Sequence, residues 1–161
     1  QPMRPKKAFS VNEATKLVAN YCAYQERCHK EVEQKLQDMN MIPEVREKIL
    51  LYLIENNFLN EERFAKAFAR GKFKHKKWGK IRNKHELQSR NISAYLIKTA
   101  MQEINDQDYY EVLLELGQKK WEAIREDNDY KRRAKLINHL IYKGFERSII
   151  HKATLEIAGK I

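Results

Sequence analysis

Three copies of a short pattern constrain the fold of this chain more than any other feature of its sequence. Each copy is a leucine followed, four and five residues later, by Asn or Gly and then by an apolar residue. The copies run from Leu36 to Met41, from Leu87 to Ile92 and from Leu140 to Phe145, at spacings of 51 and 53 residues. A period of this length indicates structural repeats that stack along the chain.

Apolar residues continue at every fourth position after each copy, and strand-like alternation is almost absent. The three rows are Met41, Val45, Ile49 and Leu53; Ile92, Leu96, Ala100 and Ile104; and Phe145, Ile149, Ala153 and Ile157. Residues four apart lie on one face of an α-helix. Each repeat is therefore expected to end in a helix that packs this row inward.

The residue before each apolar row is Asn40, Asn91 or Gly144. These residue types tolerate the left-handed backbone that closes a helix, so each repeat is expected to contain a helix-turn-helix joint here. Pro43 and Ser93 favour helix starts just after the first two joints, as a first-turn proline and an N-cap.

Each repeat also carries the signals of an opening helix. In the first repeat this helix is expected over residues 10–21, with Leu17, Val18 and Tyr21 as its apolar stripe. In the second, Asn60 is expected to cap a helix whose first turn holds two acids, which suits the positive end of the helix dipole. An equivalent segment opens the third repeat.

These patterns predict an all-α protein of three tandem three-helix repeats that form an elongated, curved, solenoid-like rod. The predicted divisions are a basic N-terminal extension at 1–9 and repeats at 10–57, 58–104 and 105–158. The middle helices are less regular, because the residues four before the key leucines are Val32, Asn83 and Leu136. The polar Asn83 leaves the packing of the second middle helix open.

The positive charge of the chain is concentrated in one stretch. The formal net charge is +10, and residues 70–90 carry +8 of it, with Glu86 as their single acid. Such a stretch favours an anionic partner. Its nine basic residues are Arg70, Lys72, Lys74, Lys76, Lys77, Lys80, Arg82, Lys84 and Arg90.

The alternative without a binding partner is that this stretch forms a solvated lysine-rich face that maintains solubility. We favour a binding role, because nine like charges repel one another unless a partner offsets them. The stretch also surrounds Trp78 with cations, a mixture suited to phosphate contact and base stacking. Trp78 stands beside a glycine in a turn, so we expect it at the surface, whereas Trp121 is expected in the core.

A second basic cluster falls at the start of the third middle helix and consists of Lys131, Arg132, Arg133 and Lys135. In the alignment of the repeats, Arg133 and Lys135 match Lys80 and Arg82. The first repeat has His29 and Glu31 there. The basic edge is therefore expected to cover the second and third repeats.

The order of motifs in the second repeat resembles that of the RecX family, which regulates the bacterial RecA recombinase. The motifs are Leu59-Asn60-Glu61-Glu62-Arg63-Phe64-Ala65, the basic stretch, Trp78-Gly79-Lys80, Glu86-Leu87 and Arg90-Asn91-Ile92. The family is also built from tandem three-helix repeats, so the resemblance covers nearly the whole chain. Asn83 departs from the apolar pattern.

The resemblance implies a partner and an activity. It implies that the protein binds the RecA nucleoprotein filament, lodges in its helical groove and inhibits filament extension, ATP hydrolysis and strand exchange. Single-stranded DNA is a second partner that the basic residues could contact directly. We assign the fourteen site residues, the nine basic residues of 70–90 with Trp78 and the second cluster, to contacts with RecA or DNA.

Other classes of function find little support. The sequence has no glycine-rich phosphate loop and no metalloprotease or serine-hydrolase motif, and its five histidines are dispersed. We therefore expect no enzyme, no cofactor and no metal site. The longest apolar run is too short to span a bilayer. With no secretory signal and two cysteines expected as free thiols, we expect a cytoplasmic monomer.

The rival hypothesis is a nucleic-acid-binding protein that uses its helix-turn-helix joints and basic edge without a recombinase. Its binding would be set by phosphates, would fall steeply with salt and would need no second protein.

Overall fold

The computed structural model describes residues 8–159, which form nine α-helices and one π-helix with no strand among them. Most of the basic extension predicted at 1–9 lies outside this range. The helices are α1 (Val11–Tyr24), α2 (His29–Asp38), α3 (Pro43–Glu55), α4 (Glu61–Gly71), the π-helix η1 (Lys72–Lys76), α5 (Lys80–Ser89), α6 (Ala94–Met101), α7 (Asp106–Ala123), α8 (Asp129–Tyr142) and α9 (Arg147–Ala158).

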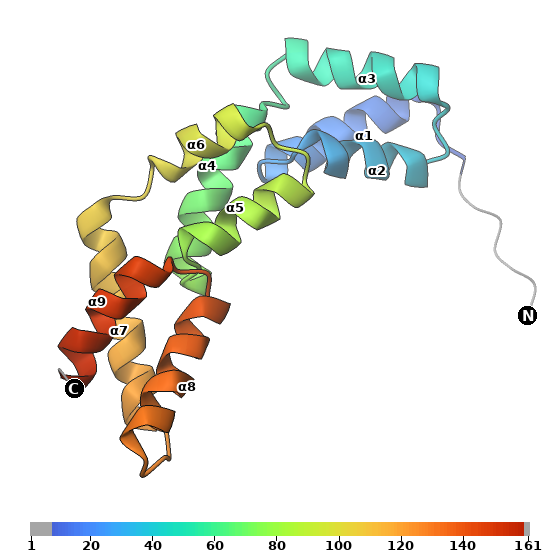
Figure 1. Cartoon of the computed structure of the whole chain (residues 1–161). Coiled ribbons are helices and arrows are strands. Elements are labelled where there is room, and N and C mark those ends of the chain that lie inside the picture. Colours follow the sequence, from blue (N-terminus) through green and yellow to red (C-terminus); the bar gives the residue numbers. More distant parts are fainter. Residues whose placement is uncertain (1–7, 160–161) are drawn as a thin grey trace, which may run out of the picture.

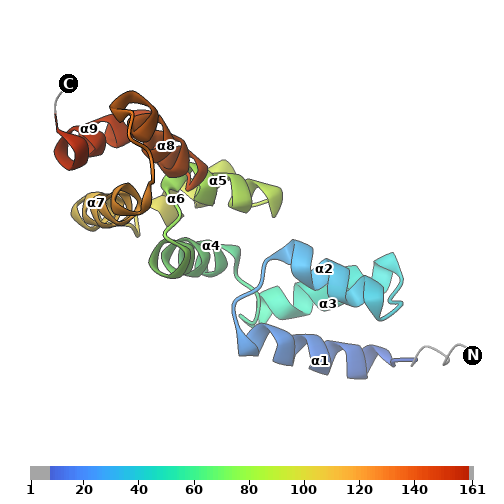
Figure 2. The ribbon, with the colours of Figure 1, turned by 90° about the horizontal axis from the view of Figure 1, so that it is seen from below.

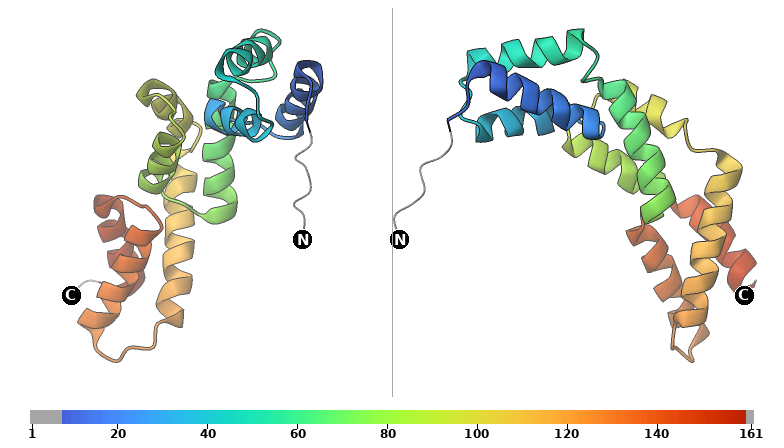
Figure 3. Two further views of the ribbon diagram at one scale, coloured as in Figure 1. Left: turned by 90° about the vertical axis from the view of Figure 1, so that its right-hand side faces the viewer. Right: turned by 180° about the vertical axis from the view of Figure 1, so that it is seen from behind.

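The helices are arranged as an elongated, curved rod (Figure 1). The groups α1 to α3 and α7 to α9 occupy its two ends, and α4 to α6 lie between them. From below, the first group is set off from the others (Figure 2), and two further views show the same arc (Figure 3). The predicted all-α repeat fold is confirmed.

Each copy of the repeated pattern is a helix C-cap. Asn40, Asn91 and Gly144 have φ values of 60°, 60° and 95°. The next residue in each copy donates its N–H back to the carbonyl of the key leucine, at 3.1 Å for Met41 and Leu36 and at 3.2 Å in the other two copies. This is the hydrogen bond of a Schellman motif, in which the leucine and the apolar residue also pack together. The pattern that repeats in the sequence therefore marks the C-terminal end of one helix in each repeat.

The predicted helix starts are also confirmed. Pro43 occupies the first turn of α3. The side chains of Asn60 and Ser93 accept hydrogen bonds from the N–H groups of Arg63 and Leu96, at 2.9 and 3.3 Å. These bonds satisfy N–H groups that a helix leaves without partners in its first turn.

The predicted stripe of the first helix is partly wrong. Ala14, Val18 and Cys22 point inward, whereas Leu17 is 42% exposed. The buried row has a four-residue step, and Leu17 lies about 100° away from Val18 around the helix. Tyr21 is half-buried, and its ring lies 3.6 Å from the guanidinium carbon of Arg27.

The buried side chains form two hydrophobic cores. One lies mainly in the first repeat, where it includes Val18, Leu36 and Leu53, and Leu59 at the start of the second repeat joins it. The other is formed mainly by the second and third repeats, with residues from Phe64 to Ala153, and is joined by Cys28 of the first repeat. The second and third repeats therefore pack as one unit.

Asn83 is fully buried on the inner face of α5. Its side-chain amide donates a hydrogen bond of 3.1 Å to the carbonyl of Ala69, near the end of α4. The polar residue in the apolar stripe thus joins two helices of the second repeat, which resolves the packing that the sequence left open.

The second repeat docks on the third through backbone groups. The N–H groups of Gly79 and Ile81 donate to the carbonyls of Lys143 and Gly144, at 2.8 and 2.9 Å. A Cβ on Gly79 would lie 2.3 Å from the carbonyl carbon and oxygen of Gly144. The turn between α8 and α9 thus satisfies the first N–H groups of α5, and only glycine fits at this approach.

The variant Gly79→Ala is expected to destabilise the fold by about 2 kcal/mol or more, because the new methyl group meets backbone that cannot rotate away. Gly71 is the matched control, since a Cβ there meets nothing within 4 Å and its backbone is helical. Gly71→Ala should leave stability unchanged or raise it by up to about 1 kcal/mol. Urea unfolding of both variants checks this, and equal midpoints would contradict the docking argument.

Candidate functional site

The basic stretch begins with Arg70 at the end of α4 and continues on the π-helix η1. This π-helix is followed by Lys77, whose φ of 57° ends the helical path. π-turns are often found at functional sites. Lys74, Lys76 and Lys77 are exposed, and their ammonium groups make no ion pair within residues 8–159. Their charges are therefore available to a partner.

Trp78 is half-buried rather than exposed, contrary to expectation. Its ring packs against Phe68 with the ring centroids 6.3 Å apart, and the guanidinium carbon of Arg82 lies 4.5 Å from its centroid. The same guanidinium lies 5.0 Å from the ring of Tyr142 in the third repeat. Arg82 is thus held between two aromatic rings, which fixes the plane of its guanidinium. Among the described residues, no acid forms an ion pair with it.

Lys143 joins Arg82 and Lys76 at the same place. Its ammonium group donates a 2.6 Å hydrogen bond to the carbonyl of Lys76. Burial, followed by the charges of Arg82 and Lys76, lowers the pKa of Lys143. We call Lys76, Arg82 and Lys143 the cationic cluster. No acid of the described chain forms an ion pair with any of the three.

Three residues of the basic stretch are neutralised by acids. Arg70 pairs with Glu103 at 3.0 Å, and Arg90 pairs with Glu86 at 3.0 Å. Lys80 lies 3.4 Å from a carboxylate oxygen of Asp106. Lys72 lies beside the rings of Phe68 and Trp78, at 5.4 and 5.2 Å. The basic residues without an acidic partner therefore occupy a smaller surface than the whole stretch of residues 70–90. Lys84 on α5 is exposed and forms no ion pair with a described residue.

The expected basic edge of the third repeat is largely occupied by internal contacts. Including Arg133 in it was wrong, because this side chain is only 8% exposed and donates to the carbonyls of Ala158 and Gly159, at 2.8 and 2.7 Å. It caps the end of α9, where cations suit the helix dipole. Asp129 pairs with the same guanidinium at 2.7 Å.

The neighbours of Arg133 in the second cluster also have local roles. Arg132 donates to the carbonyl of Trp121 at 2.7 Å and lies 3.7 Å above its ring, and that ring is half-buried at the edge of the core. Lys135 pairs with Glu126 at 3.1 Å, and this hydrogen bond lowers the pKa of Glu126. Of the four, Lys131 is the one that is exposed and makes no ion pair with any residue from 8 to 159.

Tyr109, on α7 of the third repeat, contacts the start of α5 and holds it in place. Its hydroxyl accepts a 2.8 Å hydrogen bond from the N–H of Lys80 and donates to the carboxylate of Glu146. Burial and the hydrogen bond to Glu146 raise the pKa of Tyr109, so its hydroxyl stays protonated. The ring also packs against Phe145 with centroids 5.1 Å apart. Tyr109 thus positions α5 and with it the cationic cluster.

Other kinds of site find no counterpart in the part of the chain that the structure describes. No group of three or more His, Cys, Asp or Glu residues there could hold a metal ion. Cys22 and Cys28 are buried free thiols, and burial raises the pKa of each to about 11. None of the described helices is long and apolar enough to cross a bilayer.

Comparison with known proteins identifies the family. A model of the second three-helix domain of RecX matches residues 60–101, and a model of the third matches residues 106–154. The chain belongs to the RecX family. The resemblance drawn from the sequence motifs is confirmed.

Relatives named "Regulatory protein RecX" are distant in sequence. The protein from Clostridioides difficile is 26% identical over 136 residues, which cover 83% of this chain and 62% of that protein. The protein from Clostridium botulinum is 30% identical over 132 residues, or 81% and 61% of the two chains. This chain thus spans about three fifths of the length of the relatives it matches.

Solved RecX structures share the fold. The crystal structure of RecX from Lactobacillus salivarius matches with a TM-score of 0.81 at 24% identity, over 91% of this chain and 96% of that one. A second crystal structure, of "regulatory protein RecX", has a TM-score of 0.81 at 21% identity, over 89% of this chain and 70% of the other.

In this RecX-family chain, Tyr109→Phe is expected to cost about 1–2 kcal/mol of unfolding free energy, because the N–H of Lys80 loses its acceptor and Glu146 loses its donor. Tyr95 is the matched control, since it is 76% exposed. Tyr95→Phe should lie within about 0.5 kcal/mol of the wild type. Denaturant unfolding measures both, and a Tyr109→Phe variant as stable as its control would remove the positioning role.

Proposed function

We propose that this protein binds RecA filaments on single-stranded DNA and inhibits their ATP hydrolysis, extension and strand exchange, as a regulator of recombination and DNA repair. Membership of a family whose relatives are named regulatory proteins supports this role. The observation that carries the proposal is the cationic cluster, which forms no ion pair with an acid of residues 8–159 and lies where the second repeat docks on the third.

An anionic partner would stabilise the cationic cluster. Each cation raises the electrostatic potential at the others, and partial burial of Lys143 adds to the cost of its charge. A phosphate or a carboxylate bound at the cationic cluster would offset both the repulsion between the cations and the cost of burying the charge of Lys143. The guanidinium of Arg82 is already oriented by two rings, so little side-chain entropy is lost when it binds.

The shape of the molecule supports a groove as the binding place. The repeats extend along an arc and hold their buried apolar residues in two cores, so the rod offers a long side surface (Figure 3). A nucleoprotein filament has a helical groove bounded by protein and by DNA phosphates. A curved rod with a local positive surface suits such a groove in shape and charge.

The double variant Lys76→Glu/Lys77→Glu is expected to raise the concentration needed for half-inhibition of RecA ATP hydrolysis by about tenfold, because two exposed cations become repulsive. The matched control is Lys16→Glu/Lys48→Glu, which makes the same charge change on exposed residues of the first repeat. The control should inhibit like the wild type. Equal inhibition by both folded double variants would overturn the role of this surface.

Direct binding to nucleic acid is the second candidate function, and the rings of Trp78 and Tyr142 beside Arg82 favour it. In that case binding to a naked single-stranded oligonucleotide should weaken with salt, by about 0.7 log units per log unit of salt for each phosphate contact. The Lys76→Glu/Lys77→Glu variant should then reduce this slope by about 1.4. An unchanged slope would show that these lysines do not contact phosphates of the naked strand.

A further inference from the structure

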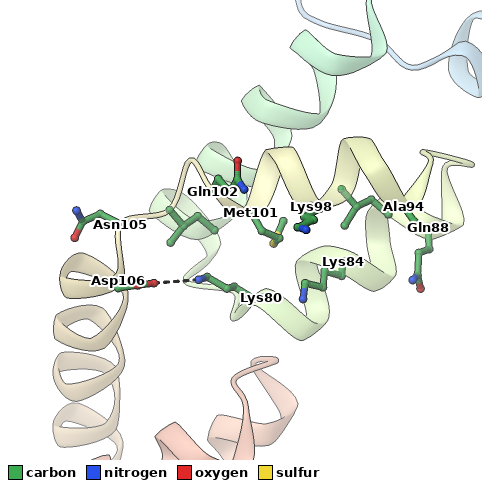
Figure 4. Close-up of a pocket in the computed structure, with 11 residues that line it drawn as sticks. Lys80, Lys84, Gln88, Ala94, Lys98, Met101, Gln102, Asn105 and Asp106 are labelled. Carbon is green, nitrogen blue, oxygen red and sulfur yellow. Dashed lines mark hydrogen bonds and ion pairs between the residues drawn. The ribbon is translucent and has the colours of Figure 1, made fainter.

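α5 carries cations on two opposite sides. Arg82 faces the third repeat as part of the cationic cluster, whereas Lys80 and Lys84 line a groove between α5 and α6 (Figure 4). Residue 82 is two positions from each of these lysines, which is about 200° around the helix. The groove has a volume of about 860 Å³ and ends at the start of α7.

The rim of this groove is positively charged. Lys84 from α5 and Lys98 from α6 line it, and both are exposed and make no ion pair within the described chain. Lys80 is the third lysine at the rim. Asp106 is the single acid in the lining, and its side chain is 98% exposed while it pairs with Lys80. The lining therefore holds three lysines against one carboxylate.

The floor of the groove is aliphatic. Ile97, Met101 and Ile104 line it and are 5%, 6% and 5% exposed, with the exposed Ala94 beside them. Methionine adapts its shape to different apolar partners. None of the described residues that line the groove is aromatic, so they offer no ring on which a base could stack. This differs from the other side of α5, where Trp78 and Tyr142 hold Arg82.

We infer that this groove is the docking site for an acidic segment of a partner protein. Aspartate or glutamate side chains of the segment pair with Lys84 and Lys98, and an aliphatic side chain between them contacts Met101. The apolar floor favours a peptide over a nucleic acid, and the lysines select an acidic one. This inference rests on the proposed function, in which the partner is an anionic assembly. It extends that function by proposing that the side of α5 with Lys80 and Lys84 binds a protein segment.

The probe for this site is a fluorescein-labelled peptide of three Glu-Glu-Leu repeats. α5 is about 15 Å long, so an extended segment of about five residues spans the groove. Fluorescence anisotropy at low salt should detect binding by the full chain, and Lys84→Glu/Lys98→Glu should weaken it by about tenfold. The control Lys16→Glu/Lys48→Glu, with the same charge change, should alter it by less than about twofold.

Two further measurements distinguish binding in the groove from a general electrostatic attraction between the acidic peptide and the basic protein. Ala94→Trp fills the groove without changing charge and should also weaken the peptide. A peptide of Glu-Glu-Ser repeats should bind more weakly than the leucine peptide, because it lacks the aliphatic contact. Equal binding of the two peptides, or equal loss in both double-glutamate variants, would overturn the proposal.

Nucleic acid as the occupant is tested with a single-stranded oligonucleotide. The groove variant Lys84→Glu/Lys98→Glu should bind it as the control variant does. A loss as large as the loss of peptide binding would assign the groove to nucleic acid and overturn the protein-docking proposal. These measurements use no recombinase, so the groove proposal and the proposed function can fail separately.

Discussion

The contact between the start of α5 and the turn after α8 is the constraint on which the rest of the structure depends. Two backbone hydrogen bonds, from Gly79 to Lys143 and from Ile81 to Gly144, complete the first turn of α5 with groups of another repeat. The approach is so close that a side chain at Gly79 would overlap the backbone. Because backbone groups have no rotamers to change, this contact sets one orientation between the repeats and aligns their shared core.

The same contact creates the candidate site. It brings Tyr142 and Lys143 of the third repeat against Arg82 of the second, and no single repeat contains that arrangement. The joint between the first and second repeats is different in kind, since side chains dominate it. Arg63 pairs with Glu26 at 2.6 Å and His29 lies 3.6 Å from Glu61. The first repeat has a separate core, although Leu59 of the second repeat joins it and Cys28 of the first repeat belongs to the other core.

Much of the fold could be predicted because its signals are local. The Leu-to-apolar pattern encodes helix ends whose hydrogen bonds span five residues, and Asn60 and Ser93 act within one helical turn. The site was harder to predict, because a count of basic residues in the sequence does not show which of them contact residues far away in the chain. Arg133 matches Lys80 in the alignment of the repeats, yet it is buried as a cap for α9. Lys143 was missed because only docking brings it to Arg82.

The proposed regulatory role is tested most directly by titrating the wild-type protein into RecA filaments and measuring DNA-dependent ATP hydrolysis. Binding of the protein to naked single-stranded DNA is measured in parallel at the same salt concentration. We expect hydrolysis to fall at protein concentrations at which naked DNA is still unbound, because the filament is the target. Inhibition that begins only as the naked DNA becomes coated would contradict this expectation, since competition for phosphates would then explain the whole effect.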